Sequence, residues 1–515
     1  MPRLGVGNIP TEILLLIARD IKQPSHRLRL ALCSHAFSDL FLPLVYQDID
    51  LSNCSAKTII ALVQTLISKP RYASCTQTLE ISDWSTDLNP DRNSYDPPEN
   101  LPPPSSDVVF DLALIRDVVQ QFFASSDKHA VCKFMAHLSA GNEDAWVGLL
   151  LFALPNLKEL NMVVPYGTFF PLRLVERAAA RLPPFDSKPA LTRLSHLFVK
   201  WWDTEDSLDV SVVEPFFFFP SMHRVVGEQI SDNPSEDDDE GAYEDQELDA
   251  VDSGRAAYLE NKPTTSTVTE IDMSKSSTKT GMIAQIKVCK NLKSFKFEHA
   301  DSFEYFSSFL PQDFARSLAH VKHSLENLWL SYDDQNFNGQ HYEGGEEVFG
   351  SLAEYSVLKS LYMSVENLLG NGVFRNPDDI ALNSPGNQQL AHILPASIES
   401  LTVVNVSKRK APGTFMQLKD LIQPSNFFRY TPRLTLLRME GEYSKIDEPN
   451  QPGIMMTLDG PEPVIPPEIL TPSKELQGLC AQVGVVFELV DSRIMLFRQL
   501  KKQLEEWRQS RADAP

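Results

Sequence analysis

A short apolar pattern that recurs along the chain constrains the fold more than any other feature. In its relaxed form the pattern reads L-x-x-L-x-L, with other apolar residues admitted. It occurs at Leu157/Leu160/Met162, Leu194/Leu197/Val199, Leu292/Phe295/Phe297, Leu325/Leu328/Leu330, Leu358/Leu361/Met363, Ile398/Leu401/Val403 and Leu434/Leu437/Met439, with a weaker match at Thr76/Leu79/Ile81. Because apolar and polar positions alternate at the end of each unit, the pattern predicts short strands with one buried face.

Helical patterns lie between these strands. They cover residues 144–154, 172–182, 303–320, 346–355 and 417–423. A unit of one strand and one helix cannot bury its apolar side alone, so neighbouring units are expected to stack. The predicted fold class is therefore α/β, a solenoid with a curved parallel sheet and outer helices. A generic α/β fold with similar short strands is the alternative.

The repeated units resemble leucine-rich repeats. They vary in length and lack the regular Asn or Cys at the turn, as in the divergent repeat domain that follows the F-box in many fungal F-box proteins. We assign this leucine-rich-repeat-like domain to residues 47–490. Residues 491–515 are predicted to form a terminal helix and tail that cap the array, because Ile494, Phe497, Leu500, Leu504 and Trp507 lie at helical spacing. A partner-binding helix is the alternative.

Residues 1–46 are predicted to form a module of three short helices. Pro10 and Glu12 mark the start of the first helix, Ser25 can cap the second, and Pro43 ends the third. Three helices of this length bury only a small core. The module is therefore expected to gain stability by docking onto a partner or onto the next domain.

The same residues resemble the F-box motif. They read Ile9-Pro10-Thr11-Glu12-Ile13-Leu14, then Ile17, Leu28, Leu32-Cys33, Phe37 and Pro43-Leu44-Val45-Tyr46. In that family the module binds the Skp-family adaptor of cullin-RING ubiquitin ligases through apolar side chains of its first helices. The resemblance implies adaptor-binding or module-core roles for Ile9, Pro10, Leu14, Ile17, Leu28, Leu32 and Phe37. The sequence does not divide these residues between the two roles, and an unrelated helical cap is the alternative reading.

An acidic block interrupts the repeat region. No Lys or Arg lies between Arg224 and Arg255, whereas Asp and Glu crowd this stretch, and a Ser/Thr-rich segment follows as far as Gly281. Such a block repels itself and buries little apolar surface, so we expect a disordered insertion at about residues 228–281. A docking site for a basic partner is the alternative. The net charge of -22 also argues against nucleic acid as a partner.

Candidate target-binding residues follow from the strand pattern. In a solenoid, the residue between the last two apolar positions of each strand lies on the concave face. These residues are Asn161, Phe198, Lys296, Trp329, Tyr362, Thr402 and Arg438. Trp329 and Tyr362 belong to successive units and should stand side by side, and aromatic residues are enriched at binding hot spots.

A second pair of aromatic residues, Trp201 and Trp202, ends another strand and is predicted to be exposed. The predicted target-binding set is Phe198, Trp201, Lys296, Trp329, Tyr362 and Arg438. The alternative is that an inserted loop covers these side chains.

Motifs for catalysis, cofactors and metals are not found in the sequence. There is no GxSxG, GxxxxGK[ST], HExxH or strand-linked GxGxxG, so no catalytic, cofactor-binding or metal-binding residue is predicted. The six cysteines lie far apart without a CxxC pair, which favours a reducing intracellular compartment, cytoplasmic or nuclear. We expect no signal peptide and no membrane partner, because no apolar run is long enough to span a bilayer.

Together with the F-box resemblance, these features predict a non-catalytic substrate receptor of a Skp-cullin-F-box ubiquitin ligase. Its expected partners are a Skp-family adaptor with its cullin complex and a target protein. An F-box scaffold outside the ligase is one alternative. An enzyme whose site assembles from residues distant in sequence is the other.

Overall fold

The computed structural model of the chain describes residues 9–21, 23–52, 54–82, 84–86, 109–123, 128–203, 206–232, 256–300, 309–332, 347–370, 389–444 and 462–512. The chain divides into two compact units, Met1–Thr269 and Glu270–Pro515. We call them the N-terminal unit and the C-terminal unit.

The N-terminal unit begins with three short helices, α1 (Thr11–Asp20), α2 (Pro24–Ala31) and α3 (His35–Val45). Ser34 caps α3, since its hydroxyl accepts a hydrogen bond from the Phe37 amide at 3.2 Å. The other helices of the unit are α4 (Ala56–Ser68), α5 (Pro70–Ala73), α6 (Leu112–Val119), α7 (Lys128–Ala140), α8 (Glu143–Phe152), α9 (Phe170–Ala179), α10 (Val210–Val213) and the 3-10 helix η2 (Glu214–Phe218).

In the described part of this unit, five strands form one parallel sheet in chain order. They are β1 (Asp48–Asp50), β2 (Thr78–Ile81), β3 (Glu159–Val164), β4 (His196–Trp201) and β6 (Arg224–Glu228). A separate parallel pair joins β5 (Leu208–Asp209) to β7 (Ile230–Ser231). The second apolar position of the pattern is in register from strand to strand, and Leu79, Leu160 and Leu197 are buried there.

Asp144, on α8, is a buried carboxylate that connects three segments of the N-terminal unit by hydrogen bonds. It accepts hydrogen bonds from the Trp84 indole at 3.0 Å and the Thr168 hydroxyl at 2.6 Å. The amides of Phe169 and Phe170 donate to it at 2.9 and 2.8 Å. Since these donors come from segments far apart in the sequence, Asp144 fixes the start of α9 beside α8.

His137, on α7, is expected to make the N-terminal unit sensitive to mild acid. Its ring packs against Phe170 with centroids 4.8 Å apart, and Nδ1 lies 3.2 Å from the Asn142 amide nitrogen. Burial, reinforced by the charge of Lys133, lowers the pKa of the imidazole from 6.5 to about 4. Because the unfolded chain binds the proton first, stability that is full above pH 6.5 should decrease as the pH falls towards 4.

Protonation of His137 should lower the free energy of unfolding by about 2–3 kcal/mol at pH 4, after allowance for the partial exposure of its side chain. Urea unfolding of the N-terminal unit at pH 7 and pH 4, with and without His137→Gln, measures it. The variant should lose less stability in acid than the wild type. An equal loss in both proteins would contradict the assignment.

The C-terminal unit contains the more regular sheet. In its described residues, seven strands pair in parallel and in chain order: β8 (Glu270–Ser276), β9 (Ser294–His299), β10 (Asn327–Tyr332), β11 (Ser360–Ser364), β12 (Ser400–Val404), β13 (Leu436–Gly441) and β14 (Val486–Asp491). Their first buried positions are in register, at Ile271, Phe295, Leu328, Leu361, Leu401, Leu437 and Phe487.

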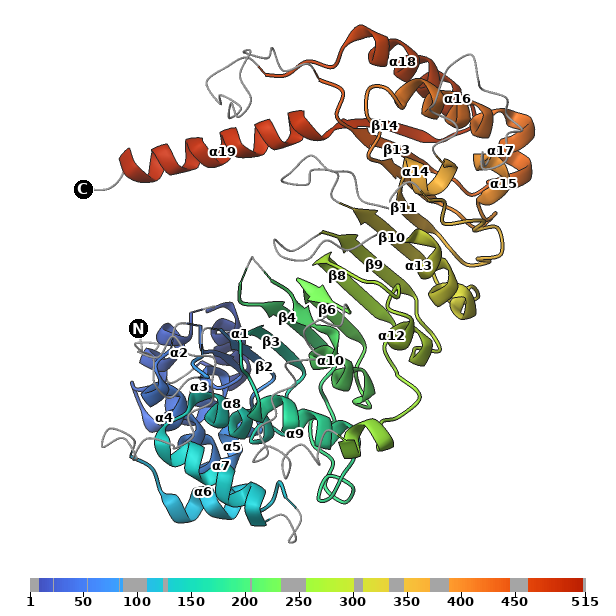
Figure 1. Ribbon diagram of the computed structural model, residues 1–515. Helices are drawn as coiled ribbons and strands as arrows, with labels where there is room; N and C mark the ends of the chain where they lie inside the picture. The colour runs from blue at the N-terminus through green and yellow to red at the C-terminus, as the bar shows by residue number, and fades with distance from the viewer. Residues whose placement is uncertain are drawn as a thin grey trace, which may run out of the picture. The chain divides into compact units, whose positions relative to one another are not determined.

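The helices of this unit are α12 (Ile283–Val288), α13 (Pro311–Leu318), the 3-10 helix η4 (Ala319–Val321), α14 (Val365–Leu369), α15 (Leu390–Ile393), α16 (Ala411–Ile422), α17 (Pro424–Tyr430), α18 (Pro467–Gln482) and α19 (Ser492–Ala512). Figure 1 shows α12, α13 and α15 to α18 on one side of the strands. Phe295 and Phe297 point to that side, where their rings contact Phe314 of α13 at 5.9 and 4.8 Å. This stacking of strand and helix units supports the predicted solenoid-like α/β fold.

The predicted disordered insertion at residues 228–281 is too long. Residues 233–255 lie outside the described residues, but Glu270–Ser276 forms strand β8 within the sheet. Ile271 and Met273 alternate with polar residues and are buried, so the segment has the same one-sided pattern as its neighbours. Polar residues, among them Glu270, Asp272 and Ser274, occupy the other positions, and the Ser/Thr-rich composition of the surrounding segment concealed the strand.

The helix predicted at residues 346–355 is also wrong. Phe349, Leu352 and Tyr355 are buried at helical spacing, yet the described residues of this segment form turns. Gly350 has a φ of +106°, which no helix accommodates. The Phe349 and Leu352 amides donate instead to carbonyls of Asn367 and Ile393, both at 2.8 Å.

The C-terminal helix α19 forms where it was predicted, but it does not cap the array along its length. Phe497 is only 2% exposed, whereas Trp507, at the far end of the predicted stripe, is 51% exposed. Figure 1 shows α19 continuing from β14 and extending away from the other labelled elements of its unit. The reason is that the helix beyond Phe497 is dominated by charged residues, which favour water over a second layer of packing.

Candidate functional site

The three N-terminal helices share a small core that accounts for two of the predicted adaptor-binding residues. Ala18, Ala31 and Phe41 form its centre, and Leu14 and Phe37 pack against it. The Phe37 and Phe41 rings meet edge to face at 5.3 Å. Leu14 and Phe37 therefore stabilise the module itself.

Arg27 connects the three helices from within. It is nearly buried, and its Nε donates to the Ile21 carbonyl at 2.7 Å, just after α1. Its Nη1 donates to the Leu44 carbonyl of α3 at 2.9 Å and lies 3.5 Å from the Asp48 carboxylate. One α2 side chain thus holds the ends of α1 and α3, which fixes the outer faces of α1 and α2.

Other predicted adaptor-binding residues lie on those outer faces. Ile17 is 45% exposed, Leu28 41% and Leu32 78%. Pro10 is exposed and starts α1, where its carbonyl accepts from the Ile13 and Leu14 amides at 3.0 and 3.1 Å, while Ile9 is half-buried.

Two further exposed residues, Ile13 and Leu16, were not in the predicted adaptor-binding set, although Ile13 belongs to the motif. They lie one helical turn or less from Ile17 and extend its apolar stripe along α1. Helical spacing relative to Leu14 and Ala18 could have placed them on the outer face. We call Ile13, Leu16 and Ile17 of α1, together with Leu28 of α2 and Leu32 directly after α2, the helical apolar stripes.

Four of the six predicted target-binding residues lie in one row across the C-terminal sheet. The row runs Asp272, Lys296, Trp329, Tyr362, Thr402, Arg438 and Glu488, each paired in register with the next. These side chains alternate with the buried positions that face the helices, so they lie on the opposite face. We call this surface the strand face of the C-terminal unit.

The centre of the row is an aromatic stack between two ion pairs. The Trp329 and Tyr362 rings are parallel, with centroids 3.4 Å apart and planes 12° apart. Lys296 Nζ lies 5.4 Å from the Trp329 ring and 3.0 Å from the Asp272 carboxylate. At the other end, Arg438 donates to Glu488 Oε2 through Nε at 2.8 Å and Nη2 at 2.5 Å.

The alternative of a loop that covers the aromatic pair stays a prediction, because residues 333–346 and 371–388 lie outside the described residues. Trp329 and Tyr362 are half-buried, and they bury much of their surface against each other. The Trp329 indole donates to the Ser331 hydroxyl at 3.1 Å, which holds the ring upright on the sheet. The stack is therefore a rigid feature of the strand face that keeps part of its surface in solvent.

A second row of strand-face residues carries carboxylates beside the stack. Glu298 and Glu440 lie two positions beyond Lys296 and Arg438 on β9 and β13, and both are half-buried. Burial, followed by the charges of Glu440 and Glu298, raises the pKa of the Tyr362 phenol. Burial likewise raises the pKa of the Glu440 carboxyl. Both carboxylates therefore add negative charge to the surroundings of the Tyr362 hydroxyl.

The two remaining predicted target-binding residues, Phe198 and Trp201, belong to β4 of the N-terminal unit. The prediction that Trp201 is exposed is wrong. Phe198 is half-buried on the face away from the core, in register with Asn161. Trp201 is only 7% exposed, whereas its neighbour Trp202 is 53% exposed. The alternation of β4 directs Leu197, Val199 and Trp201 to the core, so Trp201 cannot contact a target directly.

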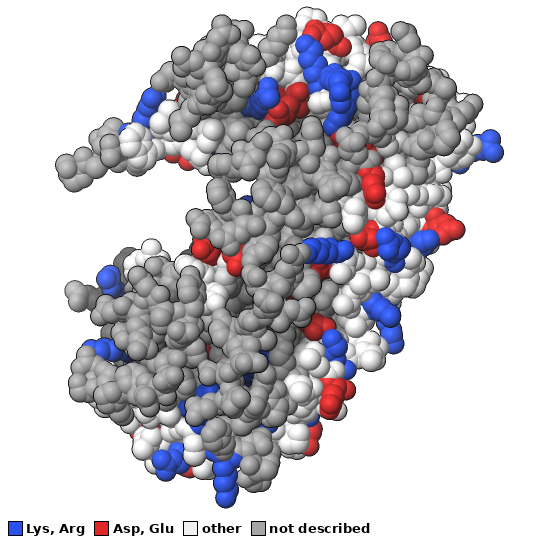
Figure 2. Space-filling model, in the orientation of Figure 1, with Lys and Arg blue, Asp and Glu red and all other residues white. Residues whose placement is uncertain are grey.

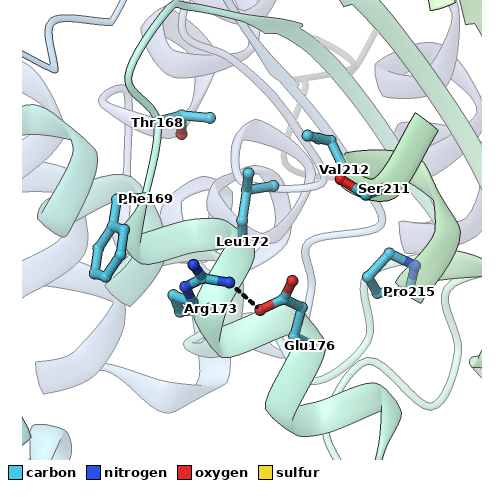
Figure 3. A pocket seen from close by; sticks show the side chains of 8 residues that line it. All are labelled: Thr168, Phe169, Leu172, Arg173, Glu176, Ser211, Val212 and Pro215. Carbon is cyan, nitrogen blue, oxygen red and sulfur yellow. Dashed lines mark hydrogen bonds and ion pairs between the residues drawn. The ribbon is translucent and has the colours of Figure 1, made fainter. Parts of the chain in front are cut away.

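A small pocket lies between α9 and the α10–η2 region of the N-terminal unit (Figure 3), with a volume of about 130 Å³. It is lined by Thr168, Phe169, Leu172, Arg173, Glu176, Ser211, Val212 and Pro215. Arg173 and Glu176 form an ion pair at 2.8 Å, and the Arg173 guanidinium lies 5.2 Å from the Phe169 ring. Among the lining residues that the structure describes, Arg173 and Glu176 are the two charged ones, and they neutralise each other.

Acidic and basic side chains are interspersed over the described surface that is visible in Figure 2. Several form ion pairs on the helix side of the C-terminal unit, including Lys322 with Glu354 and Lys419 with Glu475, both at 2.6 Å. Within the residues that the structure describes, no helix combines the length and the apolar character needed to cross a membrane.

Comparison with known protein families identifies the repeats. A leucine-rich repeat domain matches residues 255–450, which include β8 to β13. A search of curated proteins finds no match. The C-terminal unit thus contains a leucine-rich repeat domain, a class typically used for protein-protein interaction. Helices α1 to α3 lie outside the matched residues, so their F-box assignment stays a prediction.

Proposed function

We propose that this chain is a non-catalytic receptor of a Skp-cullin-F-box ubiquitin ligase. Helices α1 and α2 would dock the Skp-family adaptor, and the leucine-rich repeat domain would hold the target protein. The observation that carries the proposal is the exposure of the helical apolar stripes. Leu14 and Phe37, from the same motif, form the module core instead.

Exposed apolar side chains on so small a module point to a docking role. Full burial of one Leu or Ile side chain stabilises a fold by about 1.5–3 kcal/mol. Because five such side chains are exposed, the three helices lack a large part of the hydrophobic stabilisation that these residues could provide. An adaptor groove would bury them. The helical spacing of Ile13, Leu16 and Ile17 suits the binding of one helix face in an apolar groove.

The repeat domain supplies the second half of the proposal. Its strand face presents a rigid aromatic stack with charged side chains on both sides, as protein-binding hot spots do. A receptor of this design needs no reactive group of its own. It raises the effective concentration of the target near the enzymes of the assembly.

Reconstitution tests the proposal. The full chain is mixed with a purified Skp-family adaptor and a cullin and analysed by size-exclusion chromatography. We expect the three proteins to elute together as one complex. A complex with the adaptor that excludes the cullin would favour a scaffold outside the ligase, and failure to bind the adaptor would overturn the proposal.

A further inference from the structure

We propose that the strand face of the C-terminal unit recognises an extended, basic peptide segment, held by Glu298 and Glu440 on either side of the Trp329–Tyr362 stack. The inference rests on the proposed receptor function, because it specifies the chemistry of the target. It goes beyond that function by naming the residues that select the target and the spacing of the target's basic side chains.

The charge of the strand face favours a cationic ligand. Its two basic residues, Lys296 and Arg438, are each paired to a carboxylate of the same row, Asp272 and Glu488. Glu298 and Glu440 are different: neither takes part in an ion pair within the described part of the chain. The face therefore holds two half-buried carboxylates outside the ion pairs of the described residues, with the charge of Arg438 acting on Glu440.

The aromatic stack adds a second preference for a cation. Each of the two carboxylates lies two strands from Tyr362, on β9 and β13 respectively. Burial is the main cause of the raised pKa of the Tyr362 phenol, and the charges of Glu440 and Glu298 add to it. A guanidinium or ammonium group that settles beside either carboxylate can also contact the aromatic pair, and such contacts are attractive for both kinds of cation.

The strand spacing predicts the distance between the two cations. Glu298 and Glu440 are separated by four strand intervals of about 4.8 Å, or about 19 Å. An extended peptide rises about 3.3 Å per residue, so two basic residues about six positions apart span this distance. An even spacing also places both side chains on the same side of the peptide.

Fluorescence anisotropy with synthetic peptides tests the proposal on the full chain. The probe is a labelled Ser/Gly peptide with two arginines six positions apart. Matched peptides carry two glutamates at the same positions, or two arginines three positions apart. We expect the first peptide to bind at least tenfold more tightly than either control, and its binding to weaken with added salt.

Variants locate the site. Glu298→Gln with Glu440→Gln should lower the affinity for the arginine peptide at least tenfold, and so should Trp329→Ala with Tyr362→Ala. Glu354→Gln with Glu475→Gln removes the same charge from the helix side and should leave the affinity unchanged. Circular dichroism confirms that each variant is folded.

Equal binding of the arginine and glutamate peptides would overturn the inference, and so would a Glu298→Gln, Glu440→Gln protein that binds like the wild type. Adaptor binding is measured on the same preparations. A chain that binds the adaptor but not the arginine peptide refutes this inference alone. A chain that binds the peptide but not the adaptor refutes the proposed ligase function and leaves the peptide site standing.

Discussion

Replacing Ile17 and Leu32 together by aspartate should abolish capture of a Skp-family adaptor and leave the fold intact. Both side chains are exposed in the free chain, so a charge costs little there. In the complex each would lose an apolar contact of about 1.5–3 kcal/mol and bury an unpaired carboxylate. We expect an affinity loss of at least about 100-fold, measured by isothermal titration calorimetry.

Phe428→Asp is the matched control for this double variant. Phe428 is 66% exposed on α17, so the substitution introduces one aspartate, half the charge of the double variant, at a comparably exposed apolar position of the C-terminal unit. Its adaptor affinity should equal that of the wild type. If the Ile17→Asp, Leu32→Asp protein still binds the adaptor normally, the helical apolar stripes are not the docking surface.

Gly441→Ala is expected to destabilise the C-terminal unit strongly. A Cβ on Gly441, the last residue of β13, would overlap the Val406 carbonyl oxygen and lie 2.7 Å from its carbonyl carbon. It would also lie 2.9 Å from the Tyr443 hydroxyl. Backbone must move to admit it, so the free energy of unfolding should fall by about 3 kcal/mol.

Gly478→Ala provides the contrast. Gly478 lies within α18, and a Cβ there meets nothing within 4 Å. Since Ala is favoured over Gly inside a helix, this variant should be more stable than the wild type by up to about 1 kcal/mol. Urea unfolding of both variants measures the difference. A Gly441→Ala protein as stable as the wild type would show that the Val406 carbonyl does not approach the end of β13 as described.

The strands could be predicted because their signal is local. Each match to the L-x-x-L-x-L pattern marks a strand, from Leu160 in β3 to Leu437 in β13, because alternation needs only a few residues to show. Alternation also decides the face: Trp329 and Tyr362 occupy outward positions of their strands. Applied consistently, the same rule would have placed Trp201 in the core with Leu197.

Features that depend on contacts between distant segments could not be predicted from the sequence. The motif residues Leu14 and Ile17 are equally apolar, and only the packing of α1 against α3 shows that Leu14 faces inwards. Strand β8 was obscured by a Ser- and Lys-rich composition. Glu298 and Glu440 lie on the same surface because five successive strands pair in register. The sequence does not show this pairing directly.

Hydrogen–deuterium exchange of the full chain with and without a Skp-family adaptor tests the central claim most directly. That claim is that the chain holds two proteins on separate surfaces, an adaptor on α1 and α2 and a target on the strand face. The adaptor should slow exchange in residues 11–32 and leave the strands of the C-terminal unit unchanged. Protection of the strands by the adaptor, or no protection of α1 and α2, would contradict it.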